Sequence, residues 1–248
     1  MNRRQWWIWL VGLMMVTHHG WADQSEEDDM RDARQQMVRE IERDVTATAV
    51  YIGRGQLNQE IMRVMGEVPR HEFVPRGERD ASYVNAPLPI GFGQTISQPY
   101  IVALMTDLLA VSKEAKVLEV GAGSGYQAAV LSHLVKEVHS IEIIPQLAKA
   151  CRERIARLGY TNITVHEGDG YYGLESEAPF DAIVVTAAAS TIPPPLVRQL
   201  KAGGRLVIPV GSPFAVQHLM LVEKNSRGEI TMRQVLPVQF VPLTGKRE

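Results

Sequence analysis

The amino-acid sequence predicts an α/β fold: a doubly wound, mostly parallel sheet with a C-terminal antiparallel hairpin and an N-terminal helical extension. Three observations support this prediction. From residue 116 onward, short apolar runs alternate with segments of helical periodicity, which is typical of a parallel sheet covered on both faces. A glycine-rich loop follows the first of these runs. Near the C-terminus, two apolar runs are joined by a short polar segment, as in a hairpin.

Each expected element follows from its local pattern. Between Pro69 and Pro99 the many prolines and glycines exclude a long regular element. The Gly203-Gly204 pair is expected to form a turn before a strand. Helices are expected from about residue 38 and over 57–65, 99–109, 127–135, 146–158 and 196–200. Strands are expected over 117–120, 138–142, 163–165, 180–186 and 206–208, with the terminal hairpin over 219–223 and 230–236.

The first 22 residues resemble a secretory signal. Arg3 and Arg4 precede an apolar run over 6–16, and a polar stretch then ends in Gly20-Trp21-Ala22. A transmembrane span needs about 20 apolar residues, so this run is short for one and no stable membrane domain is expected in the mature chain. A start at Met30 or Met37 is the alternative interpretation.

Beyond the leader, two further regions are expected. Residues 23–44 are strongly charged and predict a solvated helix or a linker. Residues 45–248 are expected to form one folded domain, since the alternating pattern continues without a second linker.

Composition excludes several classes of function. Hydrophobic residues make up 45% and charged residues 22%, and the formal net charge is −2. Nucleic-acid binding needs a clustered basic surface, so no nucleic-acid partner is expected. Cys151, the single cysteine, allows no internal disulfide and is expected to be a small buried residue in a helix. No Cys/His pair has zinc-ligand spacing, so no metal is expected.

The glycine-rich loop is the first candidate binding site. It reads Glu119-Val120-Gly121-Ala122-Gly123-Ser124-Gly125-Tyr126, with a strand before it and a helix after it. A dinucleotide site needs G-x-G-x-x-G, but the third glycine comes one residue early, and no Lys-Ser or Lys-Thr follows as in a P-loop. The tight G-x-G-x-G behind an acidic strand residue resembles the first motif of the S-adenosylmethionine-dependent methyltransferases, whose fold is Rossmann-like. A tight turn without a ligand is the alternative.

Acidic residues complete the expected cofactor site. Glu142 ends the next strand, where a carboxylate can hold ribose hydroxyls. Glu119 is expected to orient the loop or to bind the methionine ammonium through water. Asp169, in a Gly-Asp-Gly turn after the third strand, is expected to accept from an adenine amino group; a simple turn is its alternative. The expected cofactor-binding residues are Glu119, Gly121, Gly123, Ser124, Gly125, Glu142, Asp169 and Gly170.

Several ordered motifs make the resemblance more specific. Residues 87–99, Pro-Leu-Pro-Ile-Gly-Phe-Gly-Gln-Thr-Ile-Ser-Gln-Pro, resemble the signature of the protein-L-isoaspartate O-methyltransferase family. Some relatives carry an aspartate near Val84 or Asn85, where this chain has no acid. The segments Phe73-Val74-Pro75, Pro179-Phe180-Asp181 and Phe240-Val241-Pro242-Leu243 match further motifs of the family.

The family resemblance implies an activity and an acceptor site. It implies methylation of the free α-carboxylate of L-isoaspartyl residues in damaged proteins and peptides, which starts repair through a succinimide. D-aspartyl residues stay open as a second acceptor. S-adenosylmethionine is the implied co-substrate, and Thr244 matches a cofactor-proximal position. The implied acceptor site is Thr95-Ile96-Ser97, with Ser97 as the active-site serine.

Ser97 has a structural interpretation as well. It is expected to cap the helix that begins near Pro99, because serine is favoured at the N-cap and proline in the first turn. A carboxylate acceptor is already ionised at neutral pH, so neither a general base nor a metal is required.

Two other functions compete with this one. One is a methyltransferase-fold enzyme acting on another carboxyl group, a small molecule or RNA; the other is a non-catalytic S-adenosylmethionine-binding module. The Thr95-Ile96-Ser97 segment argues against both.

The sequence leaves the cellular location and the oligomeric state of the protein open. The leader indicates an exported or periplasmic protein, whereas the cofactor is a charged metabolite that crosses lipid poorly. The cytoplasm is the expected location, and a monomer is the expected state.

Overall fold

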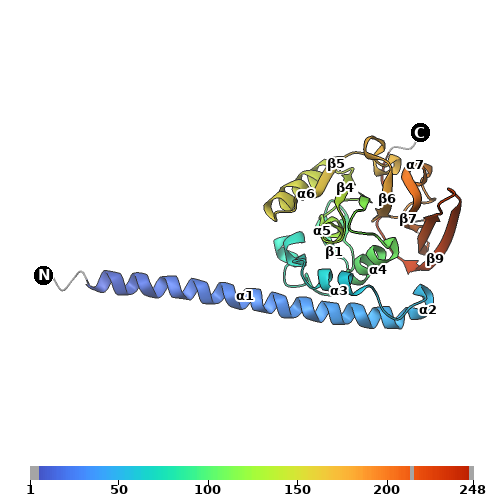
Figure 1. Cartoon of the computed structure of the whole chain (residues 1–248). Coiled ribbons are helices and arrows are strands. Elements are labelled where there is room, and N and C mark those ends of the chain that lie inside the picture. Colours follow the sequence, from blue (N-terminus) through green and yellow to red (C-terminus); the bar gives the residue numbers. More distant parts are fainter. Residues whose placement is uncertain (1–5, 213–214, 246–248) are drawn as a thin grey trace.

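The computed structural model describes residues 6–212 and 215–245, with side chains from residue 27 onward. A seven-stranded sheet in the order β5-β4-β3-β6-β7-β8-β9 forms its centre (Figure 1). The strands from β5 to β7 in this order are parallel, and β8 and β9 are antiparallel to their neighbours, so the predicted fold class is confirmed. The strands are β3 (Lys116–Val120), β4 (Glu137–Glu142), β5 (Ile163–Glu167), β6 (Phe180–Val185), β7 (Leu200–Val210), β8 (Gln217–Lys224) and β9 (Ile230–Val238).

Helices cover the two faces of this sheet unequally. The end of α1 packs with most of the other helices on one face, and α7 with two short 3-10 helices packs on the other. The helices of the first face are α3 (Gln59–Met65), α4 (Pro99–Leu109), α5 (Tyr126–Ser132) and α6 (Pro145–Arg157). Those of the second face are α7 (Pro194–Gln199), η3 (Gly170–Tyr172) and η4 (Glu175–Glu177).

The two faces have separate apolar cores because side chains alternate along a strand. In β3, Val117 belongs to the first core and Leu118 to the second, and both are fully buried. Central parallel strands buried on both faces explain why the sequence shows continuous apolar runs there.

Helix α1 (Trp6–Ala47) is one continuous element of 42 residues. The helix expected from about residue 38 therefore begins much earlier, and Figure 1 shows its first part extending beyond the domain. Its last turns bury Met37, Ile41 and Val45 in the first core. Among the residues that the structure describes, no helix combines the length and apolar character needed to cross a membrane.

The segment between α1 and α4 consists of short elements, as its prolines and glycines predicted. A hairpin of β1 (Leu88–Gly91) and β2 (Gln94–Ile96) precedes α4, and Phe92 at its tip has a φ of +53°. The buried Arg70 ties this segment to the domain: its Nε donates to Ser82 O at 2.8 Å, and its guanidinium lies 4.9 Å from the ring centre of Tyr126. The other short elements are α2 (Ala49–Ile52), η1 (Arg70–Phe73) and η2 (Arg76–Glu78).

The predicted turn at Gly203-Gly204 is wrong. Both glycines lie inside β7, which runs without interruption from Leu200 to Val210. Gly203 has a φ of +83°, and the register between β6 and β7 shifts beside it. Four residues of β7 lie between the partners of Phe180 and Ala182, against one residue of β6, so the glycine segment bulges without ending the strand.

Candidate active site

The glycine-rich loop presents bare backbone at the carboxyl end of β3. Gly121, Gly123 and Gly125 all have positive φ, which glycine adopts without a steric cost. A side-chain carbon at Gly121 would lie 2.5 Å from Thr186 Oγ1. At Gly170, in the loop after β5, it would lie 2.4 Å from a methyl group of Val120. Any larger residue at either position would therefore clash with these side chains and displace the backbone that lines the site.

Glu142 fastens this loop to the end of β4. One carboxylate oxygen accepts from Gly123 N at 2.8 Å, and the other accepts from Ile144 N at 2.9 Å. The side chain is buried, so these bonds are well shielded from water. Glu142 therefore holds the loop as well as facing the space beside it.

These residues surround an inner cavity of about 50 Å³. It lies at the carboxyl ends of β3, β4 and β6, the edge at which parallel α/β sheets bind ligands. Of the sequence-predicted residues, the inner cavity is lined by Thr95, Gly121, Gly123, Glu142, Gly170 and Thr244.

Three of the expected cofactor residues face away from the inner cavity. Glu119 is fully buried beneath the loop and accepts from Ser140 Oγ, and burial raises the pKa of its carboxyl group to about 8. Ser124 and Gly125 turn the chain into α5, and a side-chain carbon at Gly125 would lie 2.8 Å from Cys151 Sγ. Cys151 is itself fully buried, as expected, and burial raises the pKa of its thiol to about 12.

Asp169 lies beside Gly170 of the inner cavity and beneath the backbone at Gly245. Its Oδ1 accepts from Tyr171 N at 3.0 Å, which is the turn-forming bond of the alternative interpretation. A side-chain carbon at Gly245 would lie 2.1 Å from Asp169 Oδ2, so the backbone there covers the carboxylate. The chain end is held by Ala188, which donates to Val241 O and accepts from Leu243 N, both at 2.8 Å.

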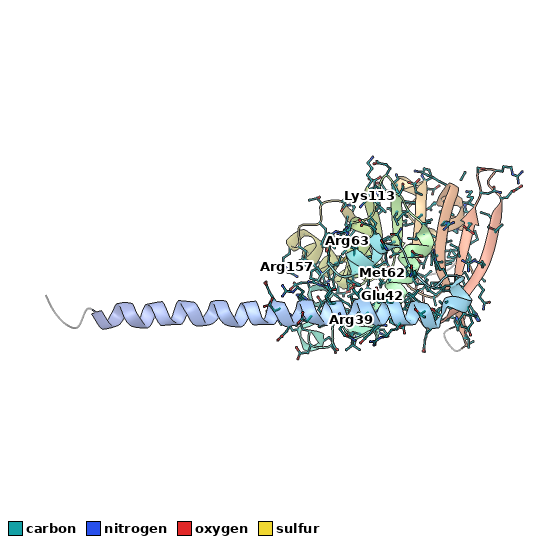
Figure 2. The ribbon with its side chains drawn as sticks, turned by 60° about the horizontal axis from the view of Figure 1, so that its bottom comes forward. Arg39, Glu42, Met62, Arg63, Lys113 and Arg157 are labelled. Atoms are coloured by element: carbon teal, nitrogen blue, oxygen red, sulfur yellow. The ribbon has the colours of Figure 1, made fainter. Side chains whose placement is uncertain are left out.

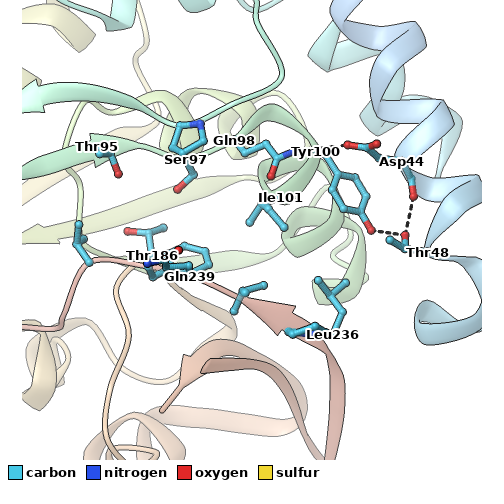
Figure 3. A pocket seen from close by; sticks show the side chains of 15 residues that line it. Asp44, Thr48, Thr95, Ser97, Gln98, Tyr100, Ile101, Thr186, Leu236 and Gln239 are labelled. Carbon is cyan, nitrogen blue, oxygen red and sulfur yellow. Dashed lines mark hydrogen bonds between the residues drawn. The ribbon is translucent and has the colours of Figure 1, made fainter. Parts of the chain in front are cut away.

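An outer cleft of about 770 Å³ opens beside the inner cavity (Figure 3). Thr95 and Ser97 lie on its wall, whereas Ile96 between them points into the core and is 3% exposed. The outer cleft is formed by the end of α1, the start of α4, Thr186 directly after β6, and residues 236–241, which comprise the end of β9 and the segment that follows it.

Ser97 does not cap α4, so that prediction is wrong. The N-cap residue is Gln98, whose side chain makes no capping bond, although Pro99 does occupy the first turn as expected. Asn85 takes the capping role, since its Oδ1 accepts from Tyr100 N at 3.0 Å. The cap comes from a residue distant in sequence, which the local pattern around Ser97 could not indicate.

The inner cavity and the outer cleft share three residues, Thr95, Thr186 and Val241. A group transferred from one space to the other would pass at this junction. Sequence reasoning missed Thr186, whose hydroxyl donates to Gly121 O at 2.7 Å. Its position directly after β6, at the ligand-binding edge of the sheet, was the available signal.

Comparison with known proteins identifies the family. A family model described as protein-L-isoaspartate(D-aspartate) O-methyltransferase (PCMT) matches residues 49–248. The chain belongs to this family. A protein-L-isoaspartate O-methyltransferase 2 of Syntrophobacter fumaroxidans is 58% identical over 99% of both chains. Another, from Polaromonas sp. strain JS666, is 62% identical over 85% of this chain and all of its own length.

Solved structures agree with this membership. One titled protein-L-isoaspartate O-methyltransferase superposes with a TM-score of 0.74 at 27% identity, over 86% of this chain and 66% of its own. A second, a Plasmodium falciparum protein in complex with S-adenosyl-L-homocysteine, has a TM-score of 0.69 at 24% identity over 86% of this chain and 97% of its own, which shows the shared fold.

Proposed function

We propose that this enzyme methylates the free α-carboxylate of L-isoaspartyl residues in damaged proteins, with S-adenosylmethionine as the methyl donor. The observation that carries the proposal is the junction at Thr95. There, the segment Thr95-Ile96-Ser97 of the family signature borders both the glycine-lined inner cavity and the outer cleft. Repair then proceeds when the methyl ester closes to a succinimide and hydrolyses. D-aspartyl residues are a second acceptor class to be tested.

The inner cavity suits S-adenosylmethionine in its chemistry. Gly121 and Gly170 line it without side chains, and Glu142 offers a carboxylate for ribose hydroxyls. The cavity volume is about 50 Å³, and a ligand of drug size occupies a pocket of roughly 300 Å³ or more. We therefore expect the backbone at Gly245, which covers Asp169, to shift outward when the cofactor binds, which would also free that carboxylate for the adenine.

The chemistry demands positioning more than acid–base catalysis. The acceptor carboxylate is ionised at neutral pH and the bound sulfonium supplies an activated methyl group, so neither a general base nor a metal is needed. One carboxylate oxygen forms the new bond to the methyl carbon as the bond between that carbon and sulfur breaks. The chain has to align the two molecules and exclude water at the junction of Thr95, Thr186 and Val241.

The start of α4 favours a carboxylate beside Ser97. The first turn of a helix carries a partial positive charge, and α4 begins at Pro99 on the wall of the outer cleft. The Ser97 hydroxyl is partly exposed on the same wall and can donate to the acceptor. We assign Ser97 and Thr95 to the positioning of the acceptor carboxylate.

The remaining assignments follow from this reaction. The partners are isoaspartyl-containing proteins and peptides, and no nucleic acid is involved. We place the active enzyme in the cytoplasm, because the cofactor is a charged metabolite that crosses lipid poorly. We further propose that the enzyme is a monomer. N-terminal sequencing of native protein from cell fractions tests the location; a mature chain beginning at Asp23 outside the cytoplasm would contradict it.

Methanol release is the direct test of the reaction. The purified enzyme is incubated with S-adenosylmethionine and an isoaspartyl peptide, with the same peptide carrying a normal aspartyl residue as control. Base-labile methyl ester should form on the isoaspartyl peptide alone. Equal methylation of both peptides, or of neither, would contradict the proposed function.

A further inference from the structure

The end of α1 contributes a wall of the outer cleft that lies outside the family-matched residues 49–248. Asp44 and Thr48, which directly follows α1, form this wall, and Gln98 lies between Asp44 and Ser97 (Figure 3). Thr48 is fixed by two bonds: its hydroxyl contacts the Asp44 carbonyl oxygen at 2.7 Å and also the Tyr100 hydroxyl. The wall is therefore attached to α4, which carries the acceptor site at its start.

The Asp44 carboxylate is held by two neutral amides. Asn85 Nδ2 donates to Asp44 Oδ2 at 2.8 Å, and Gln98 Nε2 lies 3.5 Å from the same oxygen. Asn85 is the residue that also caps α4, so one side chain fixes Asp44 relative to the helix start. The orientation of the carboxylate is thus set by the fold of the cleft.

The charge of Asp44 is not neutralised within the described part of the chain. Both of its recorded side-chain partners are amides, and no basic residue forms an ion pair with it there. The remaining side chains on the cleft wall are hydroxyl, amide or apolar groups. Among the described residues that line the outer cleft, Asp44 is therefore the only one with a charged side chain.

A fixed negative charge has opposite effects at the two ends of the outer cleft. Beside Ser97 it would repel the reacting carboxylate, but Asp44 lies beyond Gln98 from that point (Figure 3). There it attracts a cationic group of the acceptor and disfavours an anionic one. A volume of about 770 Å³ accommodates residues flanking the isoaspartyl residue as well as that residue itself.

We propose that Asp44 forms a subsite for a lysine or arginine side chain that flanks the isoaspartyl residue of the acceptor. The subsite rests on the proposed function and refines its substrate class: damaged segments with a nearby basic residue are methylated preferentially. Asn85 and Gln98 position the carboxylate, and Asp44 contacts the cation.

A peptide series with one variable charge tests the subsite. Isoaspartyl peptides carry lysine, glutamine or glutamate at one of the two positions on either side, and kcat/KM is measured by methanol release for the wild type and Asp44→Asn. Asparagine keeps an acceptor for Asn85 and removes the charge. At the position that reaches Asp44, the wild type should prefer lysine over glutamine by about two- to fivefold, as expected for a partly exposed ion pair. Asp44→Asn should lose this preference, mainly through KM.

Glu42→Gln is the matched control. Glu42 lies two residues away on α1, is exposed and does not line the outer cleft (Figure 2). The variant removes the same charge from the same helix, so a general electrostatic effect would appear equally in both variants. Asp44→Glu restores the charge and should restore the lysine preference, and raising the salt concentration should weaken it.

The outcomes separate this proposal from the proposed function. The subsite is wrong, and the activity stands, if the wild type and Asp44→Asn methylate all isoaspartyl peptides and show the same kcat/KM ratios between the lysine, glutamine and glutamate peptides. If Glu42→Gln changes the ratios as much as Asp44→Asn, the subsite is also wrong. If the wild type methylates no isoaspartyl peptide at all, both proposals fail.

Discussion

The inner cavity and the outer cleft meet at Thr95, Thr186 and Val241, but they are built in different ways. The inner cavity is lined by the glycine-rich loop, by Glu142 and by mostly apolar residues, many of them at the ends of three neighbouring strands. The outer cleft is assembled from α1, α4, the end of β9 and the segment after it, which are far apart in sequence. One space has about 50 Å³ and the other about 770 Å³.

This difference has consequences for the effects of substitutions. At Gly121 and Gly170 of the inner cavity a single added carbon meets atoms within 2.5 Å, so shape changes there should act strongly on cofactor binding. In the outer cleft, partly exposed polar side chains contact an acceptor that also touches water, so single changes should act moderately on turnover or KM. The predictions below test this division.

Gly121→Ala should have the largest effect. The added carbon lies 2.5 Å from Thr186 Oγ1 and forces an alanine to a φ of +96°. Strain and the clash together should lower the free energy of unfolding by about 2–4 kcal/mol and reduce affinity for S-adenosylmethionine at least tenfold. Chemical denaturation and calorimetry measure the two quantities.

Gly53→Ala is the control for the backbone strain in Gly121→Ala. Gly53 has a φ of +76°, but a side-chain carbon there meets nothing within 4 Å. It should lower stability by about 1 kcal/mol and leave cofactor affinity unchanged. Equal losses of affinity in both variants would mean that strain alone, without the contact to Thr186, explains the effect.

Glu142→Ala should weaken S-adenosylmethionine binding by about 1.5–3 kcal/mol, because a charged acceptor is lost. The Gly123 and Ile144 amides lose their partner as well, so the loop should become less ordered. Glu167→Ala is the matched control: Glu167 pairs with Glu142 in the neighbouring strand but does not line the inner cavity. Calorimetry showing unchanged affinity in folded Glu142→Ala would remove this residue from the cofactor site.

The elements around the inner cavity could be predicted from the sequence because the residues that define them lie close together along the chain. A strand, a loop of spaced glycines and the acid at the end of the next strand occur within residues 116–142, and β3, β4 and α6 lie close to their expected bounds. The spacing of these motifs did not reveal which of the acidic side chains face the inner cavity. Glu119 lies on the α5 side of β3 beneath the loop, since side chains alternate along a strand.

The residues of the outer cleft could be predicted only through the resemblance of residues 87–99 to the family signature. Asn85 caps α4 across a gap of 15 residues, and Asp44 reaches the outer cleft from a helix 54 residues before Gln98. Such contacts depend on tertiary packing, which leaves no periodic trace in the sequence. The turn expected at Gly203-Gly204 failed for a related reason: Leu200 and Arg205, on either side of the two glycines, both pair with β6 and keep the segment within one strand.

Glu119→Gln should change how stability depends on pH. Burial raises the pKa of Glu119 from its ordinary 4.5 to about 8, so the folded state keeps a proton that the unfolded state has lost. The resulting stability is fully present below about pH 4.5 and is lost as pH rises towards 8. Glutamine does not titrate, so the variant should become more stable relative to the wild type as pH rises. Each kcal/mol of difference in the free energy of unfolding should raise its Tm by about 2–4 °C. Parallel Tm curves from pH 5 to 8.5 would contradict the raised pKa.

Ser97→Ala should have the smallest effect on stability, and it tests the outer cleft most directly. Since Gln98 is the N-cap of α4 and Asn85 supplies the capping oxygen, removing the Ser97 hydroxyl should change the free energy of unfolding by less than about 0.5 kcal/mol. Turnover should nevertheless fall about fivefold with cofactor affinity unchanged, because one hydrogen bond of about 1 kcal/mol to the acceptor is lost. Asn85→Ala provides the contrast and should cost about 1 kcal/mol of stability as a lost cap. If Ser97→Ala lowers the melting temperature as much as Asn85→Ala and keeps normal turnover, Ser97 supports the fold and does not position the acceptor.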